Sequence, residues 1–304
     1  MGGAEGQGAL RRWDKGRLQL LAGGGALLLC LGGAALLAGG RADGSLAAGI
    51  AGEARQGGTS LPLPPALEDV AVTEARLPGR PLVVIDPGHG GADPGASGVS
   101  GEVEEKALTL LIARELRDRL AEKGRVRVAL TRDGDRSVPL DSRAAIARSL
   151  GADLFLSIHA DSAANPLARG ATVYSLSEVA SDADAARFAA AQSGPVATGS
   201  ATDGSVRALL ADLAVRDEMN ASADFAVRLL GKAPGRIALR PEPHQFAAFR
   251  VLRGAEAPAV LFEAGYLSNM EDEAMLRDPE TRGRMIAALA QAIETEMALA
   301  QASR

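Results

Sequence analysis

Residues 81–96 read PLVVIDPGHGGADPGA, and this stretch decides the fold. Its first part, Leu82 to Ile85, is a short apolar run that ends at Pro87 and Gly88, which is typical of a buried strand. Its second part opens a glycine-rich loop, residues 88–101, that carries His89 directly behind the strand. Glycine lets a backbone pass close to other groups. The stretch therefore predicts a strand that delivers a histidine to a site at its carboxyl end.

The chain continues as an alternation of strands and helices. Apolar residues at helical spacing predict a helix over 104–123, which Gly124 ends, and a second helix that Asp141 caps and that runs to Leu150. Short apolar runs predict strands at 126–130, 154–158, 171–176, 246–252 and 259–262. Helical patterns cover 181–192, 205–231 and the residues after Asp278-Pro279, with a loop at 193–204. This order predicts an α/β fold, a single three-layer domain whose twisted, mostly parallel sheet has helices on both faces.

Composition excludes some partners and restricts the chemistry. The 304 residues are 47% hydrophobic, which is enough for a sizeable core, but only 3% aromatic, and the net charge is -5. A nucleic acid is therefore not an expected partner, because its binding relies on positive charge and on aromatic stacking. The only cysteine is Cys30. A metal site in the rest of the chain would consequently use histidine and carboxylate ligands, the set typical of catalytic zinc.

The N-terminal region has the sequence pattern of an export signal. Residues 1–42 are predicted to be a signal peptide or membrane anchor, because basic residues precede the apolar stretch 18–40. A cleaved signal is favoured over an anchor in the inner membrane, and the pair Arg11-Arg12 leaves the Sec and twin-arginine routes both open. Either route predicts a periplasmic protein. Residues 43–80 are rich in Gly, Ala and Pro and are predicted to be a linker, which leaves 81–304 as the catalytic domain.

Three further polar residues are expected to join His89. His159 and Glu263 follow the apolar runs 154–158 and 260–262, and the carboxyl ends of parallel strands gather at one edge of a sheet. Glu105 begins the helix after the glycine-rich loop, with Glu104 beside it as the alternative. Two imidazoles and one carboxylate leave one position for water, which is a catalytic zinc arrangement. Glu263 is then the candidate for a carboxyl group off the metal that moves the proton.

Each of these residues also has an ordinary structural interpretation. A histidine at a strand end is usually structural, Glu105 suits the first turn of any helix, and Glu263 could pair with an arginine. Three aspartates are expected in turns or in support behind the ligands, namely Asp86, Asp93 and Asp161. His244 lies between Pro243 and Gln245 and is predicted to be a loop or substrate-side residue rather than a ligand.

Four motifs in the same order resemble the zinc-dependent N-acetylmuramoyl-L-alanine amidases of the AmiC type. They are VIDPGHGGADPGA (84–96), Glu105-Lys106, SIHAD (157–161) and FEAGYLSN (262–269), and the resemblance spans residues 81–299. It implies one zinc ion on His89, Glu105 and His159, with Glu263 as catalytic acid and base. It also implies cleavage of the amide bond between N-acetylmuramic acid and the L-alanine of the stem peptide, in wall remodelling and daughter-cell separation. Lys106 matches the family pattern and is expected to support the ligands or face the substrate, and Ala264 replaces a more usual threonine.

The resemblance further implies regulation. Relatives active in cell division carry an autoinhibitory helix over the zinc, which LytM-type activators such as EnvC or NlpD displace. This chain has a long segment in the same place, about 178–220. Our hypothesis is that one of its acids caps the metal at rest, the candidates being Glu178, Asp182, Asp184 and Glu218; the alternative is a solvated surface insertion. Another zinc peptidase on the same scaffold and an inactive wall-binding module are the competing functions, and the presence of all four motif residues disfavours the second.

Overall fold

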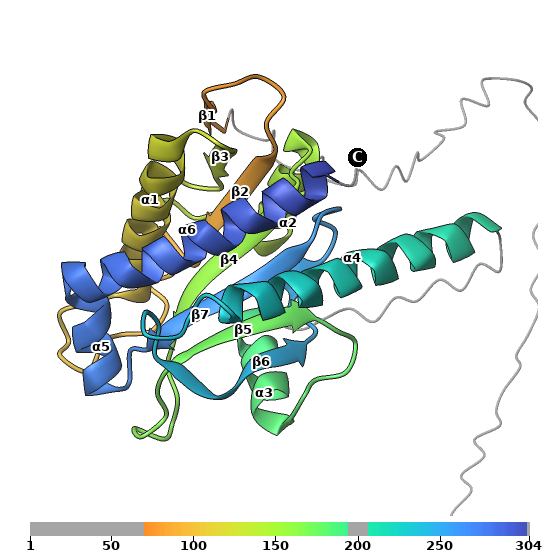
Figure 1. Cartoon of the computed structure of the whole chain (residues 1–304). Coiled ribbons are helices and arrows are strands. Elements are labelled where there is room, and N and C mark those ends of the chain that lie inside the picture. The colour runs from red at the N-terminus through yellow and green to blue at the C-terminus, as the bar shows by residue number, and fades with distance from the viewer. Residues whose placement is uncertain (1–69, 194–205, 303–304) are drawn as a thin grey trace, which may run out of the picture. The chain divides into compact units, whose positions relative to one another are not determined.

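The computed structural model describes residues 70–193 and 206–302 (Figure 1). The strands are β1 (Val72–Thr73), β2 (Leu82–Pro87), β3 (Arg127–Leu130), β4 (Leu154–Asp161), β5 (Ala171–Leu176), β6 (Leu239–Ala247) and β7 (Ala259–Tyr266). The helices are α1 (Glu105–Lys123), α2 (Leu140–Leu150), α3 (Ala183–Ser193), α4 (Val206–Leu230), α5 (Met270–Arg277) and α6 (Pro279–Ala302), and a short 3-10 helix, η1, spans Arg250–Leu252.

The strands form one seven-stranded sheet in the order β1-β3-β2-β4-β7-β5-β6. Four neighbours at its centre, β3, β2, β4 and β7, are mutually parallel. β5 runs antiparallel to β7, β6 is parallel to β5, and β1 is antiparallel to β3. The predicted α/β domain is confirmed, and its sheet is mixed. The carboxyl ends of β2, β4 and β7 lie at one edge, as the site prediction requires.

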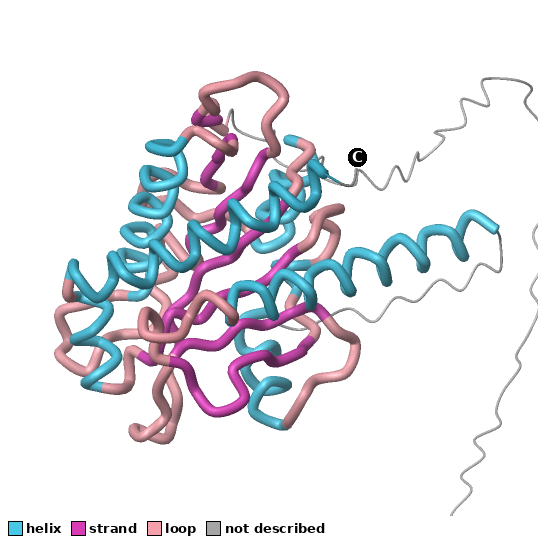
Figure 2. The backbone as a smooth tube through the Cα atoms, in the orientation of Figure 1, coloured by secondary structure: helices cyan, strands magenta, loops and turns pink. Residues whose placement is uncertain are grey.

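Helices cover both faces of the sheet (Figure 2). One core cluster joins α1, α4 and α6 to the sheet, and a second lies under α2, α3 and η1 on the other face. Successive strand residues point to opposite faces, so Val83 belongs to the first cluster and Val84 to the second. This double cover explains why Leu82 to Ile85 is a continuous apolar run with no exposed surface.

Several predicted boundaries were wrong. Asp141 does not cap α2, which begins at Leu140 after Pro139, and its carboxylate instead pairs with Arg250. The strand predicted over 246–252 is in fact the end of β6 followed by η1. Residues 72–73, inside the predicted linker, form β1 and extend the sheet. Helix α5 was not predicted, and the Asn269 side chain caps it by accepting from two backbone N–H groups.

Some predictions lie outside the described residues. They concern the segment 1–42, most of the linker 43–80 and nearly all of the loop 193–204. Among residues 70–193 and 206–302, no helix has the length and apolar character needed to cross a membrane.

Helix α4 differs from the other helices along its length. Its C-terminal part packs on the sheet and on α6 through Phe225, Ala226 and Leu229, which are buried. Its N-terminal part extends past the sheet (Figure 1), and two leucines there, Leu209 and Leu210, are each 60% exposed. Leu213 and Val215 continue the same exposed stretch.

Candidate metal centre

His89 is held in a strained backbone conformation at the end of β2. Its φ is +59°, which is uncommon for a residue with a side chain. The Arg143 guanidinium donates to the His89 carbonyl oxygen at 2.8 Å and to that of Pro87 at 2.7 Å. Arg132, which is fully buried, donates to the carbonyl oxygen of Gly88 at 2.7 Å. Two arginines therefore fix the backbone that presents the histidine.

Two glycines let the loop pass directly beside the site. A Cβ atom on Gly88 would lie 2.4 Å from Cε1 of His159, so no side chain fits there. Gly95 has a φ of +68°, and a Cβ on it would lie 2.5 Å from Oε2 of Glu105. The predicted need for glycine in this loop is thus confirmed at both positions.

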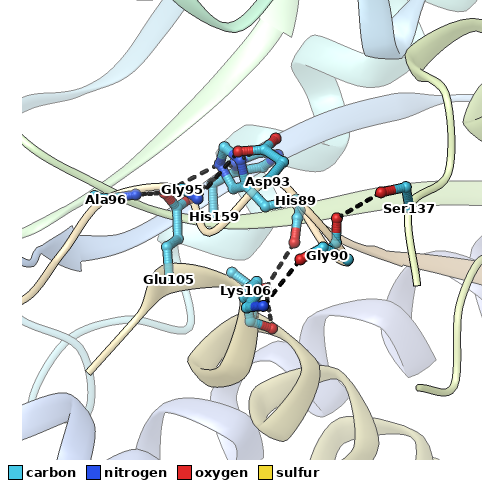
Figure 3. A network of polar contacts seen from close by, with 12 residues as sticks. His89, Gly90, Asp93, Gly95, Ala96, Glu105, Lys106, Ser137 and His159 are labelled. Atoms are coloured by element: carbon cyan, nitrogen blue, oxygen red, sulfur yellow. Dashed lines mark hydrogen bonds and ion pairs between the residues drawn. The ribbon is translucent and has the colours of Figure 1, made fainter. Parts of the chain in front are cut away.

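Glu105 joins the two histidines (Figure 3). Its Oε2 lies 3.0 Å from Nε2 of His89, and its Oε1 lies 3.1 Å from Nδ1 of His159. The ligand atoms of the three residues all lie within 4.8 Å of one another, so they could hold a metal ion. Glu105 is buried, whereas Glu104 is 54% exposed and lies 3.6 Å from Lys106. The structure therefore brings Glu105, and not Glu104, to the site.

Backbone amides keep the Glu105 carboxylate in place. Ala96 N–H donates to Oε2 at 2.9 Å and Ala160 N–H donates to Oε1 at 3.0 Å. Burial alone would raise the pKa of Glu105, but its close contacts with the His159 and His89 rings outweigh the effect of burial and hold the pKa low. The carboxylate is consequently an anion facing two imidazoles.

Glu263 lies beside His159 on the neighbouring strand. The two residues are register partners in β4 and β7, so both lie within their strands rather than just past them as predicted. Glu263 is buried, and within the described chain neither carboxyl oxygen makes a hydrogen bond of normal geometry. Burial raises the pKa of Glu263 well above its usual value, and the charges of Asp161 and Glu105 raise it further. A carboxylate whose pKa is raised in this way accepts a proton more readily than an ordinary glutamate does.

Two of the predicted supporting residues act on the loop. Asp93 Oδ2 lies 2.8 Å from Nδ1 of His89, which turns the other ring nitrogen toward Glu105. Lys106 donates to the Gly91 carbonyl oxygen at 2.9 Å and to Asp135 at 3.0 Å, and so ties the loop to α1 (Figure 3).

The other two aspartates differ from each other. Burial raises the pKa of Asp161 to about 7, and this residue lies two positions beyond His159, at the end of β4. Asp86 is fully buried and accepts hydrogen bonds from Thr131, Arg143 and Ser157. Asp86 therefore anchors the strand end rather than facing the site.

The sequence did not indicate a role for Arg132 or Arg143. Their acceptors include the backbone carbonyl oxygens of Pro87, Gly88 and His89, which are more than forty residues away in the sequence. The one available signal is Thr131-Arg132, a polar pair placed directly after the apolar strand β3, at the same sheet edge as the histidines.

His244 and the four insertion acids lie apart from this cluster. His244 is in strand β6, not in a loop, and its ring nitrogen lies 2.9 Å from Ser175 Oγ. Glu178 pairs with Arg253, Asp182 accepts from Ala185 N–H, and Asp184 pairs with Arg187. Glu218 lies in α4, where burial raises its pKa. Because β5 is antiparallel to β7, residues 177–184 follow it at the edge opposite the cluster.

The cluster fits a metal ion by its chemistry. Two imidazoles and one carboxylate are donors that suit zinc and leave a coordination position open. Nε2 of His89 is buried and forms no regular hydrogen bond with any residue of the described chain, although it faces the other donors. A lone pair so placed is costly unless a cation or a proton takes it up.

Comparison with known proteins agrees with this geometry. Residues 83–295 match the model of the Amidase_3 family, described as N-acetylmuramoyl-L-alanine amidase. The AmiA amidase of Escherichia coli K12 is 36% identical over 220 residues, which are 71% of this chain and 75% of the relative. The AmiC amidase of Neisseria meningitidis serogroup B is 35% identical over 221 residues, 71% of this chain and 52% of the relative.

A solved structure extends the likeness to three dimensions. The AmiC2 amidase of Nostoc punctiforme matches 74% of this chain and 99% of its own, with a TM-score of 0.51 and 30% sequence identity. The family model covers most of the chain, and its span contains the whole cluster of His89, Glu105, His159 and Glu263. The chain therefore belongs to the N-acetylmuramoyl-L-alanine amidase family of peptidoglycan hydrolases.

Proposed function

We propose that this protein cuts the amide bond between N-acetylmuramic acid and L-alanine with a single zinc ion held by His89, Glu105 and His159, and with Glu263 as acid and base. The observation that carries the proposal is the convergence of three donor atoms within 4.8 Å beside a buried, raised-pKa carboxyl group. Family membership supports the substrate.

The chain's own groups supply orientation and proton transfer. A bound zinc ion would lower the pKa of water and polarise the amide carbonyl. In this proposal Glu263 takes a proton from the attacking water and delivers it to the leaving amine of L-alanine. Its burial beside His159 keeps bulk water from competing for that proton. Asp93, Arg143 and the backbone amides of Ala96 and Ala160 hold the metal donors in place before substrate arrives.

The Glu263→Gln variant tests this assignment. We expect zinc content to be retained and release of stem peptides that begin with L-alanine to be lost, as followed by mass spectrometry on purified peptidoglycan. Glu296→Gln is the matched control, because Glu296 is also buried but pairs with Arg228 far from the cluster. Loss of zinc from Glu263→Gln would make Glu263 a ligand, and full activity would remove it from catalysis. Cleaved cross-links instead of free stem peptides would favour a zinc peptidase.

The exposed apolar part of α4 supports a protein partner. Leu209, Leu210, Leu213 and Val215 expose between 46% and 60% of their surface, and such a patch is typical of an interaction site. We propose that a LytM-type activator binds there. Leu209→Ser with Leu213→Ser should abolish activation by such a protein and leave basal hydrolysis unchanged. Val227→Ser is the control, since Val227 is equally exposed but lies in the packed part of α4. Retained activation of the double variant would contradict this proposal.

Two earlier expectations stay predictions. One is that an acid of the segment 178–220 covers the metal in a resting enzyme. Deletion of residues 181–204 should then raise wall hydrolysis, and an unchanged rate would count against the cap. The other is that residues 1–42 export the chain to the periplasm, either as a cleaved signal or as an inner-membrane anchor. Fractionation with detection of the mature N-terminus distinguishes these two fates.

A further inference from the structure

A groove of about 950 Å³ runs along the outer face of α6, apart from the metal donors. Its walls are the C-terminal half of α1 and the turn that contains Gly235 and Arg236. Glu105 begins α1 and Lys123 ends it, so the length of this helix, about 27 Å, separates the site from that end of the groove. The groove is therefore a second surface, distinct from the catalytic edge.

The groove is strongly positive in an otherwise acidic protein. Five cationic side chains line it against one carboxylate, whereas the whole chain has a net charge of -5. The cations are Arg119, Lys123, Arg125, Arg236 and Arg284, and the acid is Glu294. Such a concentration of one sign attracts an anion of opposite sign.

The internal pairs in the groove leave its cations available. Lys123 and Arg125 share one oxygen of Glu294 at 3.3 and 3.5 Å, which are long contacts. One carboxylate carries a single negative charge, so Glu294 cannot neutralise both cations. Two other groove cations have exposed partners beside the groove: Arg119 lies 4.0 Å from Glu122, and Arg284 lies 2.7 Å from Glu280. Arg125 exposes 69% of its side chain, and Arg119 exposes 48%. Exposed pairs of this kind contribute little, so a ligand can recruit these donors.

The shape of the groove selects a linear ligand. Along α6, the groove reaches from Arg284 to Leu299, a helical length of about 22 Å. Ala287, Ala298 and Leu299 give it an apolar floor, which suits the C–H faces of sugar rings. An extended chain with regularly placed negative groups can lie along this length and meet the cations on both sides.

The reaction itself makes an anionic chain of this kind. Hydrolysis breaks the C–N bond of the amide: the hydroxyl of water goes to the lactyl carbonyl carbon, and its hydrogen goes to the nitrogen of L-alanine, which leaves as an amine. At neutral pH the new lactyl carboxyl group is a carboxylate, and the released amine takes up its proton. In the intact strand the same lactyl carbonyl is capped by the amide and carries no charge. Each cut consequently adds one negative charge to the glycan and removes the peptide that would block close approach.

We propose that the groove on α6 binds the peptide-free glycan strand through its lactyl carboxylates. This inference rests on the proposed function, because it takes the product of that reaction as the ligand. Binding there holds the enzyme on strands that have already been cut, next to amide bonds not yet cleaved. The groove thereby makes hydrolysis of the insoluble wall more effective without altering the chemical step.

The test is a sedimentation assay with purified peptide-free glycan, in the Glu263→Gln background so that nothing is cut. Arg119→Glu with Arg125→Glu should weaken binding about tenfold or more, because two attractions become repulsions. Binding of the parent should fall as salt is raised. Arg187→Glu is the control, since Arg187 is exposed on α3 away from the groove. A second double variant, Arg236→Gln with Arg284→Gln, tests the same groove in case the first double variant does not fold.

Each outcome decides the proposal. Equal glycan binding by the parent and both groove variants would overturn it, as would undiminished binding to glycan whose carboxylates have been converted to amides. Tighter binding to anionic phospholipid vesicles, lost in the groove variants while glycan binding is kept, would assign the groove to a membrane instead. Turnover of a soluble muramoyl peptide in the wild-type background should be unchanged by the groove substitutions. Absence of that turnover in the wild-type protein would instead refute the proposed function. The sedimentation assay would still show whether the groove binds glycan, because it does not depend on hydrolysis.

Discussion

His89 and His159 reach the same point from two regions that are built in opposite ways. His159 lies within β4, between β2 and β7, and the hydrogen-bonded ladder fixes its backbone. His89 lies in a loop at positive φ, and Asp93 and Arg143 must hold its ring and its carbonyl group. A strand places a ligand through contacts that the fold needs anyway. A loop needs additional residues for the same purpose, so the His89 side should be the more vulnerable to substitution.

The largest effect is expected at Glu105, where the two regions meet. Glu105→Gln removes the negative charge that faces both imidazoles, so neither His89 nor His159 should then hold the metal well. We expect zinc to be lost on dialysis and hydrolysis to fall by more than the 10- to 100-fold that is typical of an outer supporting residue. Glu104→Gln, at the exposed neighbour, should leave both quantities unchanged. The reverse pattern, with zinc lost only from the Glu104 variant, would exchange their roles.

Arg143→Ala should damage the loop side through stability. The substitution leaves Asp86 buried without its cation, and breaking a buried pair in this way costs about 3–5 kcal/mol. Urea unfolding measures this loss, and a zinc titration of the folded fraction should show weaker binding. Arg143→Lys keeps the charge but not the planar set of donors, so its loss should be smaller. If Arg143→Ala changed neither the unfolding free energy nor the zinc affinity, the hydrogen-bonded ladder of β2 alone would be sufficient to hold His89.

Asp93→Asn should weaken zinc binding with little effect on folding. Asp93 is 64% exposed and contacts the ring of His89, so its contribution is mainly to the orientation of that ring. Loss of such a partner typically lowers metal affinity about 10- to 100-fold. Competition with a chelator measures the change, and Asp118→Asn, an exposed site on α1, supplies the baseline. Unchanged affinity would show that the backbone alone sets the ring.

The smallest effect separates backbone strain from crowding. Gly95 and Gly101 have nearly equal φ values, +68° and +73°, but only Gly95 faces the site. Gly101→Ala should cost about 1–2 kcal/mol in unfolding free energy, from the left-handed backbone alone. Gly95→Ala should add about 1–3 kcal/mol from overpacking against Glu105 and His89, together with weaker zinc binding. Equal losses for the two variants would mean that the side chains of the site move aside freely.

The sequence was sufficient for the parts of the fold that repeat a local pattern. Apolar runs and helical spacing located β2, β4, β7 and α1, and their parallel order was enough to bring His89, Glu105, His159 and Glu263 together. Long-range features were missed because nothing local encodes them. Arg132 and Arg143 bind carbonyl groups over forty residues away. His159 and Glu263 lie inside their strands because a register shift lets the ladder of β4 and β7 continue to Asp161 and Tyr266.

The form of α4 has a mechanical consequence. A helix of 25 residues is about 37 Å long, yet the buried contacts of this one are near its C-terminal end. A rigid helix held at one end acts as a lever. A force on the exposed N-terminal part of α4 would therefore rotate its packed C-terminal part through the same angle. Residues 231–238 connect α4 to β6. Arg240 in β6 lies 3.4 Å from the hydroxyl group of Tyr266. Torque applied far from the zinc donors would thus reach the rim of their edge along the covalent chain.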